Sequence, residues 1–176
     1  MNSLQKRIRA FLKDGRQASI SLQSERGMNV LYMWSRVINP FRLITNHMAI
    51  QVGKYFPLRL KITFFRFVLG MGIGRNVGIA PDTDIDPYYP ELITIGDNAV
   101  LGWKVKILCH EFTRDRMTLG RVKIGENTLI GAFTSIRAGV TIGKDAVIAM
   151  NSYVNKDIPD NGFFGGIPAR RLKVRR

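Results

Sequence analysis

Residues 124–155, IGENTLIGAFTSIRAGVTIGKDAVIAMNSYVN, repeat one pattern every six positions. An aliphatic residue opens each unit, a glycine or alanine often comes second, and a small or branched residue often comes fifth. The opening residues are Ile124, Ile130, Ile136, Ile142, Ile148 and Val154. A period of six fits neither the 3.6-residue turn of an α-helix nor the alternation of a single β-strand. It indicates short strands joined by tight turns.

The same period continues toward the N-terminus, with an insert, PYYPEL, after its third unit. The earlier opening residues are Ile73, Ile79, Ile85, Ile95, Leu101 and Ile107. Three hexapeptides make one triangular coil, so residues eighteen apart, such as Ile124 and Ile142, are expected to stack in one interior column. Each coil buries its aliphatic residues only against its neighbours, so several coils are needed. The sequence therefore predicts a mainly β fold, a parallel β-helix over residues 73–169 interrupted by a loop at 109–121.

Residues 1–72 predict a basic, amphipathic helical region in front of the β-helix. Within it, 3–14 place apolar residues on one helical face and basic residues mostly on the other. Residues 15–28, rich in Ser, Gln and Gly, predict a linker. Residues 29–52 and 57–69 predict two further helices, with breaks at Asn39-Pro40 and Phe56-Pro57. Such helices can cap the open end of a solenoid, or they can lie on an anionic membrane surface through residues 1–70. Both readings stay open, and both can hold at once.

The net charge of +14 is concentrated at the two ends of the chain. Residues 1–72 hold twelve Lys and Arg against two acidic residues, and the basic tail 170–176 adds five with no acidic residue. The middle, 73–169, has ten basic and eleven acidic residues. Basic ends can meet nucleic acid, anionic lipid or a phosphorylated cofactor. No zinc-finger spacing, RNP-type motif or helix-turn-helix pattern is found, so a nucleic-acid partner is not expected.

The remaining composition points to the cytoplasm. A single cysteine excludes an intramolecular disulfide framework. No apolar run is long enough to cross a bilayer, and the first seventeen residues, MNSLQKRIRAFLKDGRQ, lack the apolar core of a secretory signal. We expect a cytoplasmic protein that is soluble or peripheral at the inner face of the membrane.

Four stretches resemble the hexapeptide-repeat acyltransferases of the galactoside, maltose and xenobiotic acetyltransferase type. They are ITIGDNAVLG, the HE pair at 110–111, the run from 122 to 160, and GGIPARRLK. Residues 34–74 look like the helical region of a subgroup of inferred acetyltransferases. The resemblance implies a left-handed coil, although the general crossover rule would favour a right-handed one. It also implies a homotrimer with its site between subunits, and acetyl-CoA as co-substrate.

His110 is the candidate catalytic base. Acyl transfer from a thioester requires a base that removes the proton of the acceptor, groups that stabilise the oxyanion, and a site that holds the thioester in position. The resembling enzymes place a histidine base where the repeat gives way to a projecting loop, and His110 occupies that place; an ordinary surface histidine is the alternative. Glu111 and Asp115 are candidates to orient the imidazole. Cys109 is interpreted as a packing residue rather than a nucleophile.

The resemblance also implies where the cofactor binds. Positions that would contact its pantetheine arm are Ala132, Met150, Asn155 and Lys156. Arg170 and Lys173 would meet the nucleotide phosphates, with Arg171 also available, unless the tail is simply solvated. Three departures from the family pattern concern the acceptor and the thioester contacts: Leu129 stands where Trp is frequent, Met150 where a small residue is usual, and Ile167 where Asn is frequent.

No metal is expected. The related γ-type carbonic anhydrases bind zinc through three histidines, whereas this chain has only His47 and His110. The predicted function is transfer of an acetyl or other acyl group from acyl-CoA to a hydroxyl of a sugar or glycan. An amine acceptor is the alternative chemistry. A non-catalytic β-helix scaffold and an anionic-membrane-binding module are the alternative functions.

Overall fold

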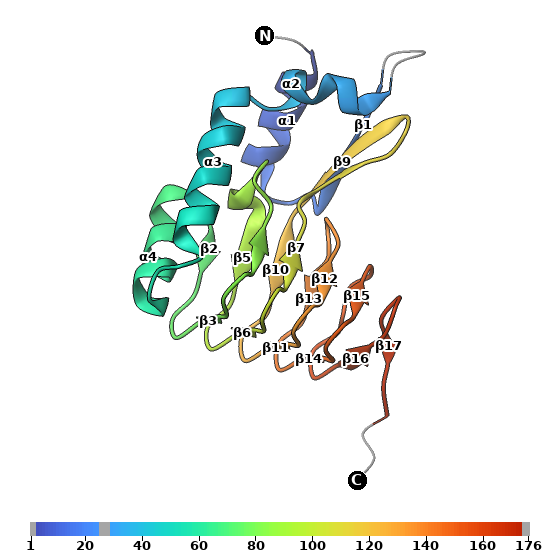
Figure 1. The fold of residues 1–176 in the computed structure, drawn as a ribbon. Helices are drawn as coiled ribbons and strands as arrows, with labels where there is room; N and C mark the ends of the chain where they lie inside the picture. Colours follow the sequence, from blue (N-terminus) through green and yellow to red (C-terminus); the bar gives the residue numbers. More distant parts are fainter. Residues whose placement is uncertain (1–2, 25–28, 174–176) are drawn as a thin grey trace.

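A layer of helices covers the first turn of a stack of triangular coils in the computed structural model, which describes residues 3–24 and 29–173 (Figure 1). The helices are α1 (Ser3–Asp14), α2 (Trp34–Val37), α3 (Pro40–Gly53) and α4 (Leu58–Val68). Two short 3-10 turns complete the helical elements: η1 (Val30–Met33) directly precedes α2, and η2 (Pro90–Leu92) lies in the coil, after Ile85 and before Ile93. No helix in these described ranges is both long enough and apolar enough to cross a bilayer.

The coils build three parallel sheets, and the chain visits the sheets in the same order on every turn. The first sheet contains β2 (Gly72–Ile73), β5 (Ile93–Ile95), β10 (Val122–Ile124) and β13 (Thr141–Ile142). The second contains β3 (Gly78–Ile79), β6 (Val100–Leu101), β11 (Leu129–Ile130), β14 (Val147–Ile148) and β16 (Phe163–Gly165), with β17 (Arg170–Arg171) antiparallel at its edge. The third contains β4 (Asp84–Ile85), β7 (Lys106–Ile107), β12 (Ser135–Ile136) and β15 (Tyr153–Val154).

Every predicted opening residue lies in the interior at the end of a short strand. The register pairs Ile124 with Ile142, and Ile130 with Ile148, as the eighteen-residue spacing requires. None of these twelve side chains is more than 9% exposed. Burying them in columns supplies the main driving force for the fold, at roughly 25 cal/mol for each Å² of apolar surface removed from water. The predicted hexapeptide β-helix is thereby confirmed.

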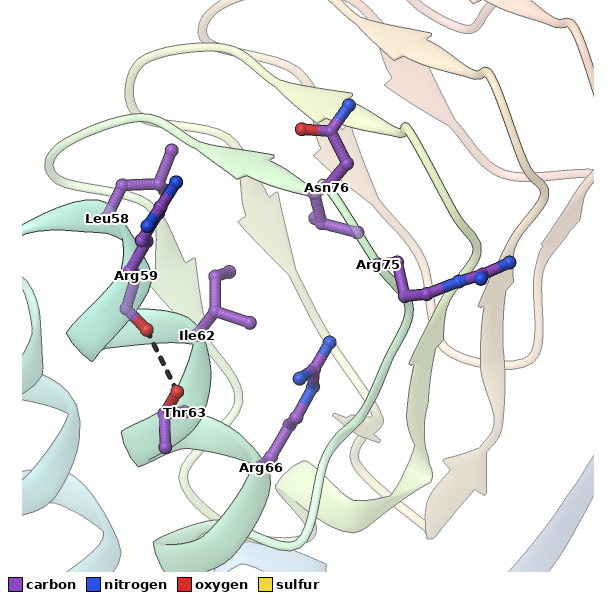
Figure 2. Close-up of a pocket in the computed structure, with 8 residues that line it drawn as sticks. Leu58, Arg59, Ile62, Thr63, Arg66, Arg75 and Asn76 are labelled. Carbon is purple, nitrogen blue, oxygen red and sulfur yellow. Dashed lines mark hydrogen bonds between the residues drawn. The ribbon is translucent and has the colours of Figure 1, made fainter.

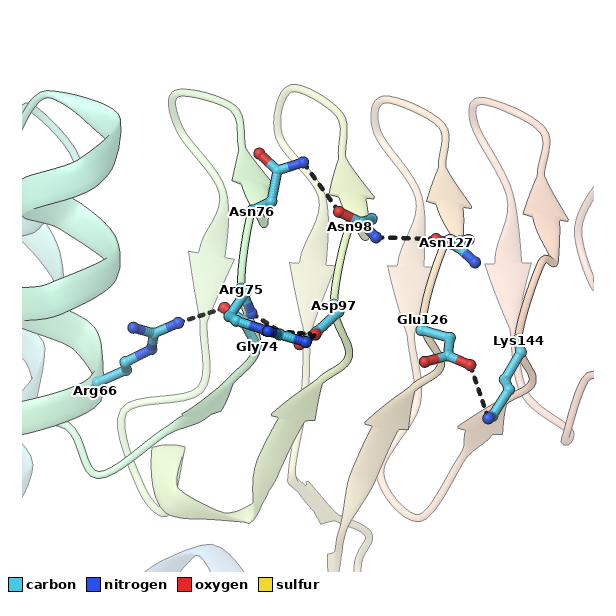
Figure 3. Close-up of polar contacts among 9 residues, drawn as sticks. All are labelled: Arg66, Gly74, Arg75, Asn76, Asp97, Asn98, Glu126, Asn127 and Lys144. Atoms are coloured by element: carbon cyan, nitrogen blue, oxygen red, sulfur yellow. Dashed lines mark hydrogen bonds and ion pairs between the residues drawn. The ribbon is translucent and has the colours of Figure 1, made fainter.

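Tight corners between the strands need residues that tolerate a left-handed backbone. Asn76, Asn98, Asn127 and Asp145 have φ angles of +54° to +57° at one corner, and Asn and Asp are the non-glycine residues that adopt this region most readily. Their side chains form a hydrogen-bonded ladder from coil to coil, at 2.9 and 3.2 Å from Asn76 through Asn98 to Asn127 (Figure 3) and at 3.1 Å from Asn127 to Asp145. Glycine is required elsewhere at the corners: a Cβ at Gly125 would lie 2.6 Å from the backbone of the next coil.

The predicted loop at 109–121 is instead a β-hairpin, and the predicted linker contains its third strand. Strands β8 (His110–Phe112) and β9 (Arg116–Gly120) pair antiparallel, and β1 (Ser19–Gln23) pairs with the outer edge of β9. The linker prediction is therefore wrong for residues 19–23, whereas 25–28 lie outside the described residues. Strand β1 saturates the backbone groups of β9 and buries Leu22, which is 1% exposed. Its polar residues, two serines and a glutamine, lie on the other face. Because Ser and Gln are also typical of linkers, the sequence predicted a linker there.

The N-terminal helices form where the sequence predicts them, and the predicted break at Asn39-Pro40 is confirmed. The predicted helix 29–52 is broken at Asn39-Pro40, where the Asn39 side chain caps α3 by accepting a hydrogen bond from the Phe41 amide at 2.9 Å. Helix α4 packs Ile62 and Phe65 inward, and it contacts β2 and β3 of the first coil. The helical layer therefore covers the open end of the β-helix, as the capping interpretation predicts.

Replacing Leu101 by alanine tests the interior column. Leu101 is 0% exposed, so its loss should lower the free energy of unfolding by about 2–5 kcal/mol. Val100, its neighbour in β6, is 45% exposed, and Val100→Ala should cost no more than about 0.5 kcal/mol. Urea unfolding followed by circular dichroism measures both. Equal losses for the two variants would contradict the assignment of an interior and an exterior face.

Candidate functional site

His110 and Asp86 meet where two successive coils leave the repeat. Asp86 follows β4 and begins the segment that includes the insert PYYPEL, and His110 begins the hairpin one coil later. Strands β4 and β7 are paired with Ile85 opposite Ile107, so the segments that follow them lie side by side. The Nδ1 atom of His110 is 2.6 Å from Oδ2 of Asp86.

The Asp86 carboxylate is completely buried, and both of its oxygens accept hydrogen bonds. Its Oδ2 accepts hydrogen bonds from the backbone amides of Cys109 and His110, at 2.6 and 3.0 Å, and its Oδ1 accepts one from the Tyr88 amide at 2.8 Å. Charge-assisted bonds of this kind compensate for the loss of water around a buried carboxylate. Since a carboxylate is an acceptor, the favoured imidazole tautomer carries its hydrogen on Nδ1 and leaves a lone pair on Nε2.

Two aromatic side chains hold the imidazole ring from its sides. The Tyr88 ring lies against the His110 ring with 4.0 Å between centroids, and the Phe112 ring meets it edge-on at 5.3 Å. Only 18% of the His110 side chain is exposed. Burial, and then the charge of Asp86, raise the pKa of the Tyr88 hydroxyl, so it stays protonated at neutral pH. The arrangement fixes the ring while leaving part of it open to solvent.

Glu111 and Asp115, the acids predicted to orient the imidazole, do not contact it. Glu111 forms a bidentate ion pair with Arg137 on the next coil, at 2.6 and 2.9 Å. Asp115 bonds to Thr113 and Arg116 within the hairpin turn. The partner acid is corrected to Asp86, because adjacent side chains on a strand point in opposite directions. A catalytic role for Glu111 stays a prediction.

Cys109 is buried in the interior beside this site, with no exposed surface. Burial, followed by the charges of Asp86 and Glu91, raises the pKa of its thiol well above the usual value. A thiol that resists ionisation is a poor nucleophile. The interpretation of Cys109 as a packing residue is confirmed.

The predicted pantetheine contacts fall on two different corners of the coil. Ala132 and Met150 follow β11 and β14 at the corner between the second and third sheets, and the Asn151 amide bonds to the Ala132 carbonyl at 2.8 Å. Met150 is 64% exposed there. Asn155 and Lys156 instead follow β15, at the corner from which the hairpin projects two coils earlier. The third sheet separates the two groups within one chain.

The predicted phosphate contacts lie on the last strand. Arg171 and Lys173 line an open groove together with Asn161, Phe163 and Leu172. Arg170 donates to the carbonyl of Ala169 at 3.0 Å and does not line that groove. Strand alternation thus places Arg171, rather than Arg170, with Lys173. Residues 174–176 of the predicted tail lie outside the described residues.

The parts of the chain that the structure describes contain no cluster of metal-ligating side chains. No group of three His, Cys, Asp or Glu side chains there is close enough to hold an ion. His47 lies on α3 and His110 on the hairpin.

Comparison with known proteins gives the family. The model "bacterial transferase hexapeptide (six repeats)" matches residues 121–156. YvoF of Bacillus subtilis (strain 168), an inferred acetyltransferase, is 34% identical over 150 residues, which cover 85% of this chain and 87% of YvoF. The chain belongs to the hexapeptide-repeat acetyltransferases. The family predicted from the sequence motifs is confirmed.

Two solved structures of this family share the fold. A galactoside acetyltransferase in complex with coenzyme A aligns with a TM-score of 0.67 and 20% identity, over 98% of this chain and 91% of its own. The Vibrio cholerae enzyme VCA0836, complexed with acetyl-CoA, aligns with a TM-score of 0.64 and 23% identity, over 79% of this chain and 88% of its own. At 23 and 20% identity, these structural similarities establish that this chain has the same fold as the two enzymes.

Alkylation of Cys109 tests the burial of the site. Because its thiol is enclosed and its pKa is raised, the folded protein should react with iodoacetamide at pH 8 at least about tenfold more slowly than free cysteine. Mass spectrometry of the time course measures the rate. Unfolding in guanidinium should restore ordinary reactivity, and rapid labelling of the folded protein would contradict the assignment.

Proposed function

We propose that this protein is a CoA-dependent acetyltransferase that moves an acetyl group from acetyl-CoA to a hydroxyl of a sugar or glycan, with His110 as general base. The observation that carries the proposal is the His110–Asp86 pair at the root of the projecting hairpin. The galactoside acetyltransferase that shares the fold supports a sugar hydroxyl as the acceptor. An amine remains the alternative acceptor, and the use of acetyl-CoA favours a cytoplasmic location.

The geometry of His110 suits proton transfer in both halves of the reaction. Its Nε2 accepts the proton of the acceptor hydroxyl while that oxygen attacks the acetyl carbonyl carbon. Asp86, bonded to Nδ1, holds the ring in the required tautomer and stabilises the imidazolium that forms. When the carbon–sulfur bond breaks, Nε2 returns the proton to the departing sulfur. Asp86 is a positioning residue in this scheme, because it acts through His110.

A homotrimer with a left-handed coil completes the proposal. Ala132 and Met150 lie across the third sheet from the His110 hairpin, so one chain alone presents the two halves on different corners. In a closed threefold ring, the corner of one subunit can face the hairpin of the next. Ala132 would contact the pantetheine arm at its corner, and Arg171 and Lys173 offer cations for the phosphates. Residues 1–72 would act as the cap, 73–169 as the catalytic coil and 170–176 as the phosphate-binding tail.

Replacing His110 by alanine tests the base. The variant should release thiol from acetyl-CoA about 10²–10⁴-fold more slowly in the presence of an acceptor. Asp86→Asn should also lower kcat, with little change in the KM for acetyl-CoA, because Asp86 acts on the tautomer and position of the ring and not on the cofactor. A thiol reagent follows both reactions, and gel filtration and circular dichroism confirm assembly and folding.

Glu111→Gln is the matched comparison for Asp86→Asn. A small effect would confine Glu111 to its ion pair with Arg137, whereas a loss of kcat as large as that of Asp86→Asn would give Glu111 a catalytic role. Unchanged turnover in His110→Ala would remove His110 as the base. A wild-type protein that binds no acyl-CoA would favour the non-catalytic scaffold.

Mixing two inactive variants tests the shared site. His110→Ala leaves the Ala132 corner intact, and Ala132→Trp should block that corner while leaving His110 intact. If each site combines His110 of one subunit with Ala132 of the next, random mixed trimers should regain activity in about a quarter of their sites. Refolding the two variants together, with each variant alone as control, measures the recovery. Mixed trimers with no activity would place both residues of the site in one subunit.

A further inference from the structure

Helix α3 is apolar on the face that turns away from the coil as well as on the face that packs against it. Ile50 and Gly53 are buried on the inner side. The opposite side carries large exposed residues at a spacing of three, four and four: Phe41, Ile44, Met48 and Val52, at 75, 62, 57 and 49% exposure. This spacing places all four in one stripe along the helix.

Helix α4 repeats the arrangement. Its Ile62 and Phe65 pack inward, whereas Leu60 and Phe67 lie on the opposite side, and Phe67 is 84% exposed. The two helices lie beside each other in the layer over the first coil (Figure 1). We call the exposed residues of both helices the outer apolar face: Phe41, Ile44, Met48, Val52, Leu60 and Phe67. A continuous exposed apolar surface of this kind marks a contact site rather than a solvated helix.

The segment that carries this face is strongly basic. Residues 29–69 contain six Lys and Arg and no acidic residue, whereas the coil over 73–169 is close to neutral. Arg42 and Lys54 are paired with Glu91 and Asp84 of the coil. Arg59 makes no ion pair with any residue that the structure describes, and it lies on the flank of α4. Positive charge therefore borders the outer apolar face.

An open groove at the edge of α4 gathers further cations (Figure 2). Arg59, Arg66 and Arg75 line it. Arg66 donates to the backbone carbonyls of Ile73 and Gly74, and Arg75 pairs with Asp97 at 2.9 Å (Figure 3). Three arginines therefore line the groove, and Asp97 lies outside its lining. Arg66 and Arg75 are bonded within the protein, whereas Arg59 has no ion pair with a described residue. Guanidinium groups are suited to phosphate oxygens, which they bind through two parallel hydrogen bonds.

We propose that the outer apolar face docks on an anionic lipid bilayer, with Arg59 and its groove at the lipid phosphates. Apolar residues on one side of a helix and cations along its flanks are the combination by which helices lie in the membrane interface. A second copy of the chain fits this surface less well, because two basic segments would be brought together. The attachment is independent of the acetyl transfer proposed above, and it would bring the enzyme to membrane-bound acceptors.

Sedimentation of the full-length protein with phosphatidylcholine vesicles, with and without phosphatidylglycerol, tests the proposal. The protein should bind only the vesicles that contain phosphatidylglycerol, and high salt should weaken the binding. The double variant Phe41→Ser/Phe67→Ser should lower the partition coefficient about tenfold or more, because its exposed rings no longer enter the interface. Arg59→Glu should lower it at low salt.

Two variants on the coil are matched controls. Val100→Ser removes an exposed apolar residue and Lys123→Glu reverses an exposed charge, both on strands of the coil and outside the outer apolar face and the arginine groove, and each should bind vesicles as the wild type does. Circular dichroism checks that all variants are folded.

The proposal is overturned if phosphatidylglycerol vesicles do not sediment the protein, or if the coil controls lose as much binding as the helix variants. It is also overturned if the protein ignores vesicles but self-associates with increasing concentration, and Phe41→Ser/Phe67→Ser abolishes that association. A second copy would then be the occupant of the outer apolar face.

Discussion

The stacking of aliphatic side chains in three interior columns is the constraint on which the rest of this structure depends. Each opening residue is buried only because the coils before and after it present another one eighteen residues away, or further where an insert intervenes. Every strand of the coil itself is two or three residues long and has no stability of its own. The corners must therefore be tight, which explains the Asn ladder from Asn76 to Asp145 and the glycines where successive backbones touch.

The candidate site arises from two departures from this regular stacking. The chain leaves the register after Ile85 and again after Ile107, and these residues are neighbours in the third sheet. The two irregular segments are consequently forced together, and the buried Asp86 carboxylate bonds three amides and one imidazole. A buried carboxylate is costly unless it is bonded in this way. The hydrogen bonds that offset the cost of burying the Asp86 carboxylate also hold the His110 ring in place. One set of bonds therefore stabilises the fold and positions the imidazole.

The N-terminal region serves the coil in two ways. Helices α3 and α4 cover the first coil, which has no preceding coil to bury its apolar side chains. Strand β1 crosses to the hairpin and completes its sheet, and the Arg121 guanidinium ties the hairpin back to the carbonyls of Phe11 and Leu12. The hairpin is thus held from both sides. That support is a reason to expect His110 to keep its geometry in the absence of a ligand.

The sequence alone determined what depends on short-range repetition. The six-residue period located the opening residues and the strands they end, and its interruption located His110 and the projecting segment. Cys109 could be assigned to the interior for the same reason. Only the tertiary structure decided the partners that lie far apart along the chain: Asp86 for His110 across 24 residues, Arg137 for Glu111 across 26, and β1 for β9 across about a hundred. A periodic pattern specifies which side of the backbone is buried, but side-chain partners outside the repeat depend on how the irregular segments bend. If the coils had been aligned across the insert, the pairing of Ile85 with Ile107 would have predicted that Asp86 lies beside His110. No feature of the β1 sequence predicts that it pairs with β9.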